Sequence, residues 1–259
     1  MSLQGPGAAS LAPPRSVDIL GVRVHAVTYQ DTLDLIAAWI EEGKPHQLAT
    51  SNPEFVMAAQ RDPAFRDVLN AADLCVPDGV GLLWAAKLLD QPLPAQVTGS
   101  DLVPLVAREA TARGWRLYLL GAAPGVAEQA AAVLQRLNPG LVIAGTYAGS
   151  PADDEAGAIV DRVRLARPDV LFVAYGAPAQ DLWIARHRDR LAVAVMAGVG
   201  GAFDHLAGVR RRAPLWVQQV HLEWLFRLIS QPWRWRRQLA LPRFAARVLR
   251  QRLQRQAMD

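Results

Sequence analysis

The chain has 259 residues with 51% hydrophobic content, which excludes a disordered chain and allows a substantial buried core. Its formal net charge is only +4, so the strongly basic character of the segment from Arg210 onward is local. The single cysteine, Cys75, excludes an internal disulfide framework and a metal site built from several thiolates.

The first half of the chain predicts a flexible arm over residues 1–16 and a strand pair over residues 17–27. Short apolar segments then alternate with amphipathic ones. We expect strands over 46–49 and 74–76, and helices over 32–42, 52–60, 81–89 and from the 98–101 segment to 112. Thr50, Ser51 and Pro53 are expected to open the helix at 52, and Ser100 to cap the helix that ends at 112.

The second half predicts a more regular alternation of strands and helices. The expected strands are 116–120, 141–146, 169–174 and 193–198, and the expected helices are 126–137, 154–166 and 181–190. Such an alternation requires crossover connections, which predicts an α/β fold with a Rossmann-like, largely parallel sheet and helices on both of its faces. We expect this core to span residues 17–208.

Residues 209–259 are expected to form a helical C-terminal appendage. From Arg210 onward the chain is rich in arginine and tryptophan but has only two acidic residues, Glu223 and Asp259. Arginine interleaved with tryptophan favours an anionic bilayer surface, although aromatic side chains also stack on nucleic acid bases. No apolar stretch is long enough to span a bilayer and no signal peptide is evident, so we expect a cytoplasmic protein that meets a membrane from one side.

Parallel sheets bind ligands beyond the C-terminal ends of their strands, which draws attention to the loops there. These loops are 50–54, 77–81, 121–125, 176–180 and 198–204. Asp78 lies in a tight turn directly after a predicted strand. A carboxylate fixed at such a point can act as a general base, although an aspartate turn residue or helix cap is an equally good interpretation.

Other polar residues in these loops have two interpretations each. Thr50 and Asn52 offer a hydroxyl and an amide at a helix start, which suits an anion or a sugar but also an ordinary cap. Gln180 can bind a sugar hydroxyl or a diphosphate oxygen, or it can be a solvated first-turn residue. Gly200 and Gly201 would let the backbone approach a phosphate closely, but this cluster is not the dinucleotide-binding fingerprint.

No metal site is predicted, because the five histidines show no ligand spacing and no two aspartates are separated by one residue. A transferase without a metal must neutralise a departing diphosphate with arginines or helix N-termini. Arg227, Arg234 and Arg237 are spaced so that they can share one helix face. An ordinary solvated basic face is the alternative interpretation.

Several of these segments form an ordered set of motifs. They are TSNPE at 50–54, PDGVG at 77–81, TGSDL at 98–102, GAPAQ at 176–180, GVGGAFD at 198–204, and RAP at 212–214 followed by EWLFR at 223–227. In this order they resemble the WecG/TagA/CpsF glycosyltransferases, over about residues 17–237. The resemblance implies a metal-independent, inverting transfer of N-acetylmannosamine from its UDP derivative to undecaprenyl-diphosphate-linked N-acetylglucosamine, without a cofactor, during cell-surface polysaccharide synthesis such as that of teichoic acid.

The resemblance also assigns catalytic roles to individual residues. In such an enzyme Asp78 is the base that activates the acceptor hydroxyl, and Thr50, Asn52 and Gln180 line the donor and acceptor pocket. The enzyme would work at the inner face of the plasma membrane, where its lipid-linked acceptor lies. No nucleic acid partner is implied, and a homo-oligomer is left open.

Substrate-binding roles follow from the same resemblance. Asp204 would lie near the uracil, in the glycine-rich loop that also holds Gly200 and Gly201. Arg227, Arg234 and Arg237 would bind the donor diphosphate from a C-terminal appendage that closes over the active site at the membrane.

One departure from the family pattern concerns the residue before the Val-Thr-Gly segment, where the family commonly has arginine and this chain has Gln96. A neutral amide cannot replace that charge. Gln96 therefore keeps a second interpretation open, in which the donor is another UDP-sugar, such as UDP-glucose or the uronate of N-acetylmannosamine, used in exopolysaccharide synthesis. A remoter alternative is a nucleotide-binding or nucleic-acid-binding module that uses the basic tail.

Overall fold

The computed structural model describes residues 14–210, residue 214 and residues 240–257. Strands and helices alternate along the chain as far as α9 (Ala202–Leu206), and one long helix, α13 (Ala240–Gln256), follows near the C-terminus. The predicted arm over residues 1–16 lies almost wholly outside the described residues, and Ser16 already belongs to the first strand.

The centre of the fold is a six-stranded sheet with the strand order β4-β3-β8-β7-β5-β6, in which all neighbours run parallel. Its strands are β3 (His46–Ser51), β4 (Leu74–Pro77), β5 (Arg116–Gly121), β6 (Val142–Tyr147), β7 (Val170–Ala174) and β8 (Val195–Gly198). The predicted parallel sheet is therefore confirmed. Since all six strands point the same way, their C-terminal ends meet at one edge, where the loops named above gather.

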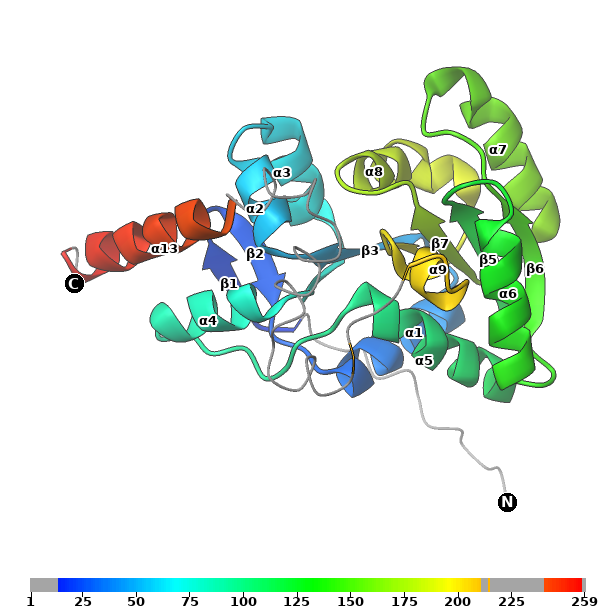
Figure 1. The fold of residues 1–259 in the computed structure, drawn as a ribbon, viewed down its shortest axis with the longest axis horizontal. Helices are drawn as coiled ribbons and strands as arrows, with labels where there is room; N and C mark the ends of the chain where they lie inside the picture. The colour runs from blue at the N-terminus through cyan, green and yellow to red at the C-terminus, as the bar shows by residue number, and fades with distance from the viewer. Residues whose placement is uncertain (1–13, 211–213, 215–239, 258–259) are drawn as a thin grey trace.

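Helices cover both faces of this sheet, as predicted (Figure 1). One face packs against α1 (Tyr29–Glu42), α5 (Gly99–Arg113) and α6 (Val126–Leu137), and the other packs against α7 (Asp153–Ala166) and α8 (Ala179–Leu191). Strand β5 shows how the sequence divides between the two layers. Leu117 and Leu119 enter the first layer, whereas Tyr118 and Leu120 enter the second, because successive side chains of a strand point to opposite faces.

An N-terminal hairpin builds a third apolar cluster, called the hairpin core below, beside the edge strand β4. Its strands β1 (Ser16–Ile19) and β2 (Val22–His25) pair antiparallel, which confirms the predicted strand pair. His25 connects the hairpin to the sheet, because its Nδ1 accepts a hydrogen bond from the Cys75 backbone N–H at 2.9 Å. The helices that share this core are α2 (Pro53–Ala59), α3 (Pro63–Ala71), α4 (Val80–Leu88) and α13.

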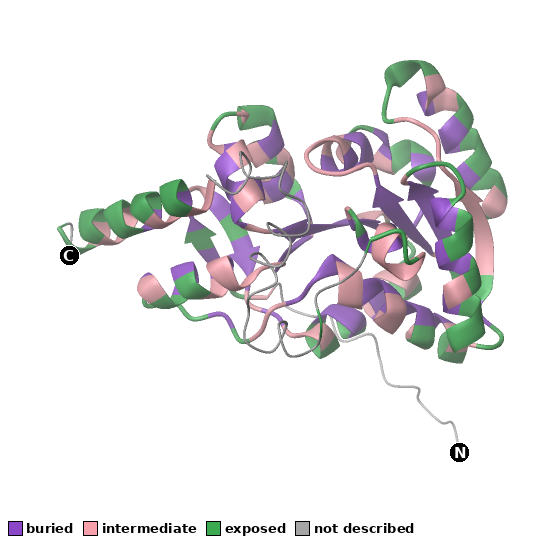
Figure 2. Cartoon of the chain, in the orientation of Figure 1, coloured by how far each residue is buried: buried purple, intermediate pink, exposed green. Residues whose placement is uncertain are grey.

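Helix α13 packs against α2 and α4 and thereby becomes part of the hairpin core. Phe244 and Val248 point into this core and are 2% and 0% exposed. Leu249 and Leu253 remain exposed on the outer side of the helix, and Figure 2 shows that outer surface as largely exposed. Of the helices in the described ranges, none combines the length and apolar character needed to cross a membrane.

The start of α2 differs from the expectation by one or two residues. Asn52, rather than Thr50 or Ser51, is the N-cap, and its Oδ1 accepts a hydrogen bond from the Phe55 backbone N–H at 3.1 Å. Thr50 and Ser51 continue β3 instead, because both remain paired with β4. The strand ladder therefore holds these two residues, and the helix starts only where the pairing ends.

Two further differences concern helix starts. Thr98, rather than Ser100, caps α5, and its Oγ1 accepts a hydrogen bond from the Asp101 backbone N–H at 3.2 Å. Helix α3 is absent from the sequence-based prediction, although Asp62 caps it and Pro63 occupies its first turn, a combination typical of helix starts.

The packing of α13 leads to a prediction about stability. Phe244→Ala removes a buried ring from the hairpin core, and such changes reduce the free energy of unfolding by about 3 to 5 kcal/mol. Leu253→Ala, on the same helix but 65% exposed, is the matched control and is expected to change it by less than about 0.5 kcal/mol. Urea unfolding followed by circular dichroism measures both, and equal values for the two variants would contradict this packing of α13.

Candidate active site

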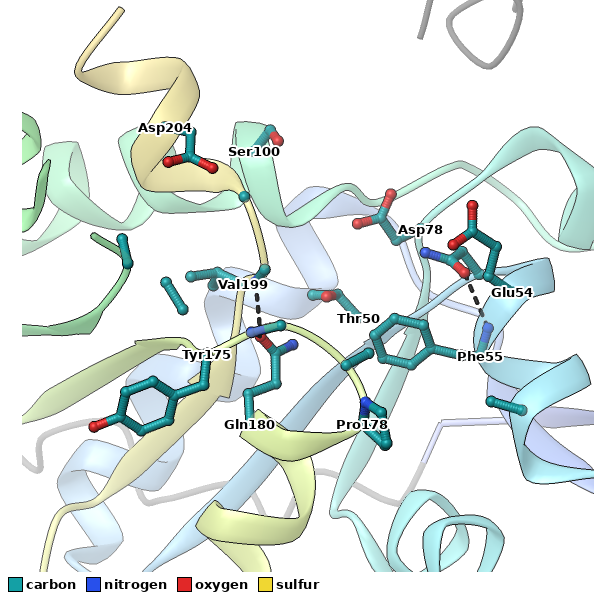
Figure 3. A pocket seen from close by; sticks show the side chains of 18 of the residues that line it. Thr50, Glu54, Phe55, Asp78, Ser100, Tyr175, Pro178, Gln180, Val199 and Asp204 are labelled. Carbon is teal, nitrogen blue, oxygen red and sulfur yellow. Dashed lines mark hydrogen bonds between the residues drawn. The ribbon is translucent and has the colours of Figure 1, made fainter. Parts of the chain in front are cut away.

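A cavity of about 970 Å³ opens at the C-terminal edge of the sheet. The predicted site residues that line it are Thr50, Asn52, Asp78, Gln180, Gly200, Gly201 and Asp204. They come from the ends of β3, β4 and β8, from the start of α8 and from α9 (Figure 3). Arg227, Arg234 and Arg237, the other predicted site residues, lie outside the described residues.

Asp78 is held at the end of β4 by its own backbone and by its carboxylate. Its N–H donates to the Ser51 carbonyl oxygen at 2.6 Å, and its Oδ2 accepts a hydrogen bond from the Gly99 N–H at 3.1 Å. Gly99 is the first residue of α5, and the positive end of a helix dipole stabilises an ionised carboxylate. Asp78 does not cap the helix that follows it, because the N-cap of α4 is Gly79 and no side chain caps α4.

The turn that carries Asp78 packs directly on the start of α2. A methyl group added at Gly81 would lie 2.6 Å from Pro53 Cγ, so only a glycine allows this approach. Gly79 has a φ of 147°, a conformation that side chains rarely adopt. These glycines therefore place Asp78 and Asn52 on neighbouring parts of one cavity wall.

Thr50 and Asn52 each use part of their hydrogen-bonding capacity within the protein. Thr50 is 3% exposed, and its hydroxyl group donates a hydrogen bond to the Gly198 carbonyl oxygen at 2.8 Å. Its oxygen can still accept a hydrogen bond. The Asn52 Oδ1 is occupied by the cap of α2, so the amide N–H₂ is the group that Asn52 offers to a ligand.

Gln180 lies in the first turn of α8 and is fully buried, which excludes the solvated first-turn residue that its position also suggested. Its Oε1 accepts hydrogen bonds from the Gly176 N–H at 3.1 Å and from the Gly200 N–H at 3.0 Å. One amide oxygen thus connects the loop after β7 to the loop after β8. Gln180 fixes the shape of the cavity floor as well as lining it.

Gly198, at the end of β8, is the point where this packing is tightest. A methyl group placed there would lie 2.6 Å from Gln180 Nε2 and 2.8 Å from Asp181 Oδ1. Thr50 donates to the carbonyl oxygen of the same residue. The side chains of Thr50, Gln180 and Asp181 therefore converge on a strand position that has no side chain of its own.

Asp181 is the residue of this group that the sequence reasoning missed. It is 0% exposed, and neither carboxylate oxygen makes a well-aligned hydrogen bond within the described structure. Burial raises the pKa of its carboxyl group to about 7, while the nearby Gln180 side chain opposes the rise. In the sequence alone, an aspartate in the first turn of a helix indicates a solvated residue that interacts favourably with the helix dipole.

Asp204 lies on α9, at the other side of the cavity from Asp78 (Figure 3). Its Oδ2 forms an ion pair with Arg210 Nε at 3.2 Å, and the Arg210 N–H donates to the Asp204 carbonyl oxygen at 3.0 Å. Gly200 precedes this helix with a φ of 52°, which favours glycine. The Gly200 and Gly201 backbone therefore reaches the cavity without an intervening side chain.

Further cavity-lining residues were not among the predicted site residues. They are chiefly Glu54, Arg61, Tyr175, His205, Arg210 and Arg243. Tyr175 packs edge-on against Trp183 with ring centroids 5.8 Å apart, and burial raises the pKa of its hydroxyl group. Gln96, the departure from the family pattern, is partly buried and lies outside the cavity lining.

Acidic, histidine and cysteine side chains do not gather into groups of three or more that could hold a metal ion in the part of the chain that the structure describes. The cavity instead brings together carboxylates, amides, hydroxyls and several arginines. Such a set can accept a proton, bind sugar hydroxyls and bind anionic groups.

Comparison with known proteins places the chain among sugar transferases. The model of the glycosyl transferase WecG/TagA/CpsF family matches residues 17–258. The chain is 34% identical over 216 residues to an N-acetylglucosaminyldiphosphoundecaprenol N-acetyl-beta-D-mannosaminyltransferase of Bacillus spizizenii, covering 83% of each chain. Identity to the Staphylococcus aureus enzyme of the same name is 32% over 234 residues, covering 90% of this chain and 91% of the relative. The family match thus includes the basic tail.

The close approach at Gly198 predicts a large effect of a small substitution. Gly198→Ala would force Gln180 and Asp181 away from β8, and overpacking of this kind lowers the free energy of unfolding by about 1 to 3 kcal/mol. Gly157→Ala is the matched control, because a methyl group there meets nothing within 4 Å and removes a helix-interior glycine. Gly157→Ala is expected to raise the free energy of unfolding by about 0.5 to 1 kcal/mol. Denaturant unfolding of both variants checks the opposite signs.

The buried carboxyl group of Asp181 predicts a pH-dependent stability. The pKa of its carboxyl group rises from 3.8, the ordinary value of an aspartate, to about 7 in the fold. The folded state therefore keeps a proton that the unfolded state loses between these two pH values. The contribution of Asp181 to stability therefore falls as the pH rises from about 4 to about 7 and stays low above it.

Asp181→Asn removes this charge, and we expect its stability relative to the wild type to increase with pH, by up to about 4 kcal/mol in total. Urea unfolding of both proteins at pH 5, 6, 7 and 8 measures the difference. A difference that is the same at every pH would show that Asp181 does not titrate in this range.

Proposed function

The chain belongs to the WecG/TagA/CpsF family of glycosyl transferases, and we propose that it transfers N-acetylmannosamine from its UDP derivative to N-acetylglucosamine linked to undecaprenyl diphosphate. The relatives named above carry this acceptor and this sugar in their names. The observation that carries the proposal is the gathering of the strand-end residues of β3, β4 and β8 around one cavity. Cell-surface polysaccharide synthesis of the teichoic acid type is the proposed context.

In the proposed reaction Asp78 is the general base. The acceptor hydroxyl oxygen attacks the anomeric carbon of the donor sugar, Asp78 takes the hydroxyl proton, and the bond to UDP breaks so that UDP leaves with the electron pair. Attack from the face opposite the leaving group inverts the anomeric configuration. The position of Asp78 supports this role, because the Gly99 N–H holds one oxygen of a carboxylate that lines the cavity.

The other proposed site residues bind and orient the two substrates. Thr50 and Asn52 are on the same wall as Asp78 and can bind sugar hydroxyls, and Gln180 holds the floor beneath them. Asp204, beside Gly200 and Gly201, is proposed to lie near the uracil.

The charge that develops on departing UDP needs cationic partners. We assign this part to Arg227, Arg234 and Arg237 on the basis of the family pattern. The appendage over residues 209–259 is proposed to attach the enzyme peripherally to the inner face of the plasma membrane, where the lipid-linked acceptor would be within reach. Tryptophan and arginine side chains in this segment suit such a surface.

The second candidate function keeps the family and changes the donor to UDP-glucose or to the uronate of UDP-N-acetylmannosamine. Gln96 is the feature that favours it, and the position of Gln96 outside the cavity lining weakens the case. Product analysis with these donors and one lipid-diphosphate acceptor separates the two. Nucleic acid binding by the basic tail, the remotest alternative, predicts salt-sensitive binding to DNA or RNA.

Asp78→Asn tests the base assignment, because the amide has nearly the same shape but cannot accept the proton. We expect kcat for transfer to the lipid-linked acceptor to fall by about 100-fold to 10,000-fold, with the melting temperature nearly unchanged. Asp67→Asn is the control, since the Asp67 side chain is 75% exposed and lies on α3 outside the cavity lining. Unchanged turnover in the Asp78 variant would exclude Asp78 as the base.

A further inference from the structure

Two arginines line the cavity without a protein partner in the described part of the chain. Arg61 follows α2, and Arg243 lies in the first turn of α13. Both are exposed, and neither guanidinium group makes an ion pair or a hydrogen bond with the described residues. Arg210, which also lines the cavity, is instead paired with Asp204. Two unpaired guanidinium groups beside a cavity are a site for an anion.

The position of Arg243 follows from a row of polar residues on α13. Residues 243, 247, 251 and 255 are four apart and therefore share one side of the helix. Arg247 donates to Gln60 Oε1 at 3.2 Å, and Gln251 accepts from the Leu20 N–H at 3.1 Å and donates to Asp18 Oδ1 at 3.0 Å. Arg243 continues this row to the point where the protein surface is hollow.

The same contacts bring Arg61 to the same part of the cavity. Gln60, which binds Arg247, is the residue directly before Arg61. Gln60 is itself held, because its Nε2 donates to the Leu20 carbonyl oxygen at 2.6 Å. Arg61 thus lies just after α2, and Arg243 lies in α13. The spacing of these two helices is fixed by core packing and by hydrogen bonds.

The wall that carries these arginines is the wall of the proposed base. Helix α2 starts beside the Asp78 turn and has seven residues. At about 1.5 Å of rise per residue, its far end, close to Arg61, is about 10 Å away. A sugar ring, its diphosphate and an extended arginine side chain together bridge such a separation. Asp204, near which we placed the uracil, is on the opposite side of the cavity (Figure 3).

We propose that Arg61 and Arg243 together bind the diphosphate of the lipid-linked acceptor. This proposal rests on the proposed function. It gives the enzyme a second diphosphate site, separate from the site that binds the diphosphate of UDP. Glu54 and Asp78 line the same wall, so a diphosphate bound there needs cationic groups close to it. With the diphosphate held here, the acceptor sugar lies between the arginines and Asp78, and its hydroxyl faces the base.

Acceptor binding in the absence of any donor tests this site independently of the transfer reaction. The probe is N-acetylglucosamine diphosphate with a short lipid chain, titrated calorimetrically into the full-length protein. We expect Arg61→Ala and Arg243→Ala each to weaken its binding by about tenfold or more, because each removes a charge-assisted contact. Arg250→Ala is the matched control, since Arg250 is an exposed arginine of the same helix outside the cavity lining.

Two further titrations identify the group that is bound. UDP should bind the wild type and the Arg61 and Arg243 variants equally, and the acceptor analogue without its diphosphate should not distinguish them. Weaker UDP binding with unchanged acceptor binding would assign the arginines to the donor and overturn the proposal. Acceptor binding that is unchanged, or reduced equally by Arg250→Ala, would also overturn it. If the variants lose acceptor binding while the wild type transfers no N-acetylmannosamine, the proposed donor is wrong. In that case the proposed diphosphate site is still supported.

Discussion

The arrangement of the site depends on the close approach of α8 to β8 at Gly198. Because this residue has no side chain, Gln180 can reach across the end of the strand, and one oxygen then holds the two loops that form the cavity floor. Thr50 fixes the neighbouring strand to the carbonyl group of the same glycine. Any larger residue at this position separates the helix from the sheet, and the loops lose their common anchor.

Asp181 shows what this close packing costs. A carboxyl group without a well-aligned partner in a fully buried position is unfavourable when ionised, and the elevated pKa records that penalty. The apolar layers on both sides of the sheet offset it, since nearly every strand residue around Gly198 is buried. The destabilising carboxyl group of Asp181 thus lies beside the middle of the sheet, where apolar packing is most extensive.

The sequence predicted the parallel sheet and its strand-end loops, and with them Asp78, Asn52 and Gln180, because strand direction alone brings these loops to one edge. The predicted helix start was less accurate near Asn52, because Thr50 and Ser51 pair with β4 instead of capping α2. The burial of Asp181 and the cavity contact of Arg61 were beyond prediction. Both depend on how distant elements pack, which neither spacing nor composition records.

The contacts between the hairpin and α13 join two segments that lie far apart in the sequence. Gln251 binds Leu20, which precedes it by 231 residues. A chain that emerges from the ribosome with its N-terminus first must therefore hold the hairpin without this partner until α13 has been made. The apolar surface that later covers Phe244 and Val248 stays open during that time. The wall of the cavity that carries Arg243 is thus completed only after α13 has been made, so a chain interrupted before α13 has an intact sheet but an incomplete site.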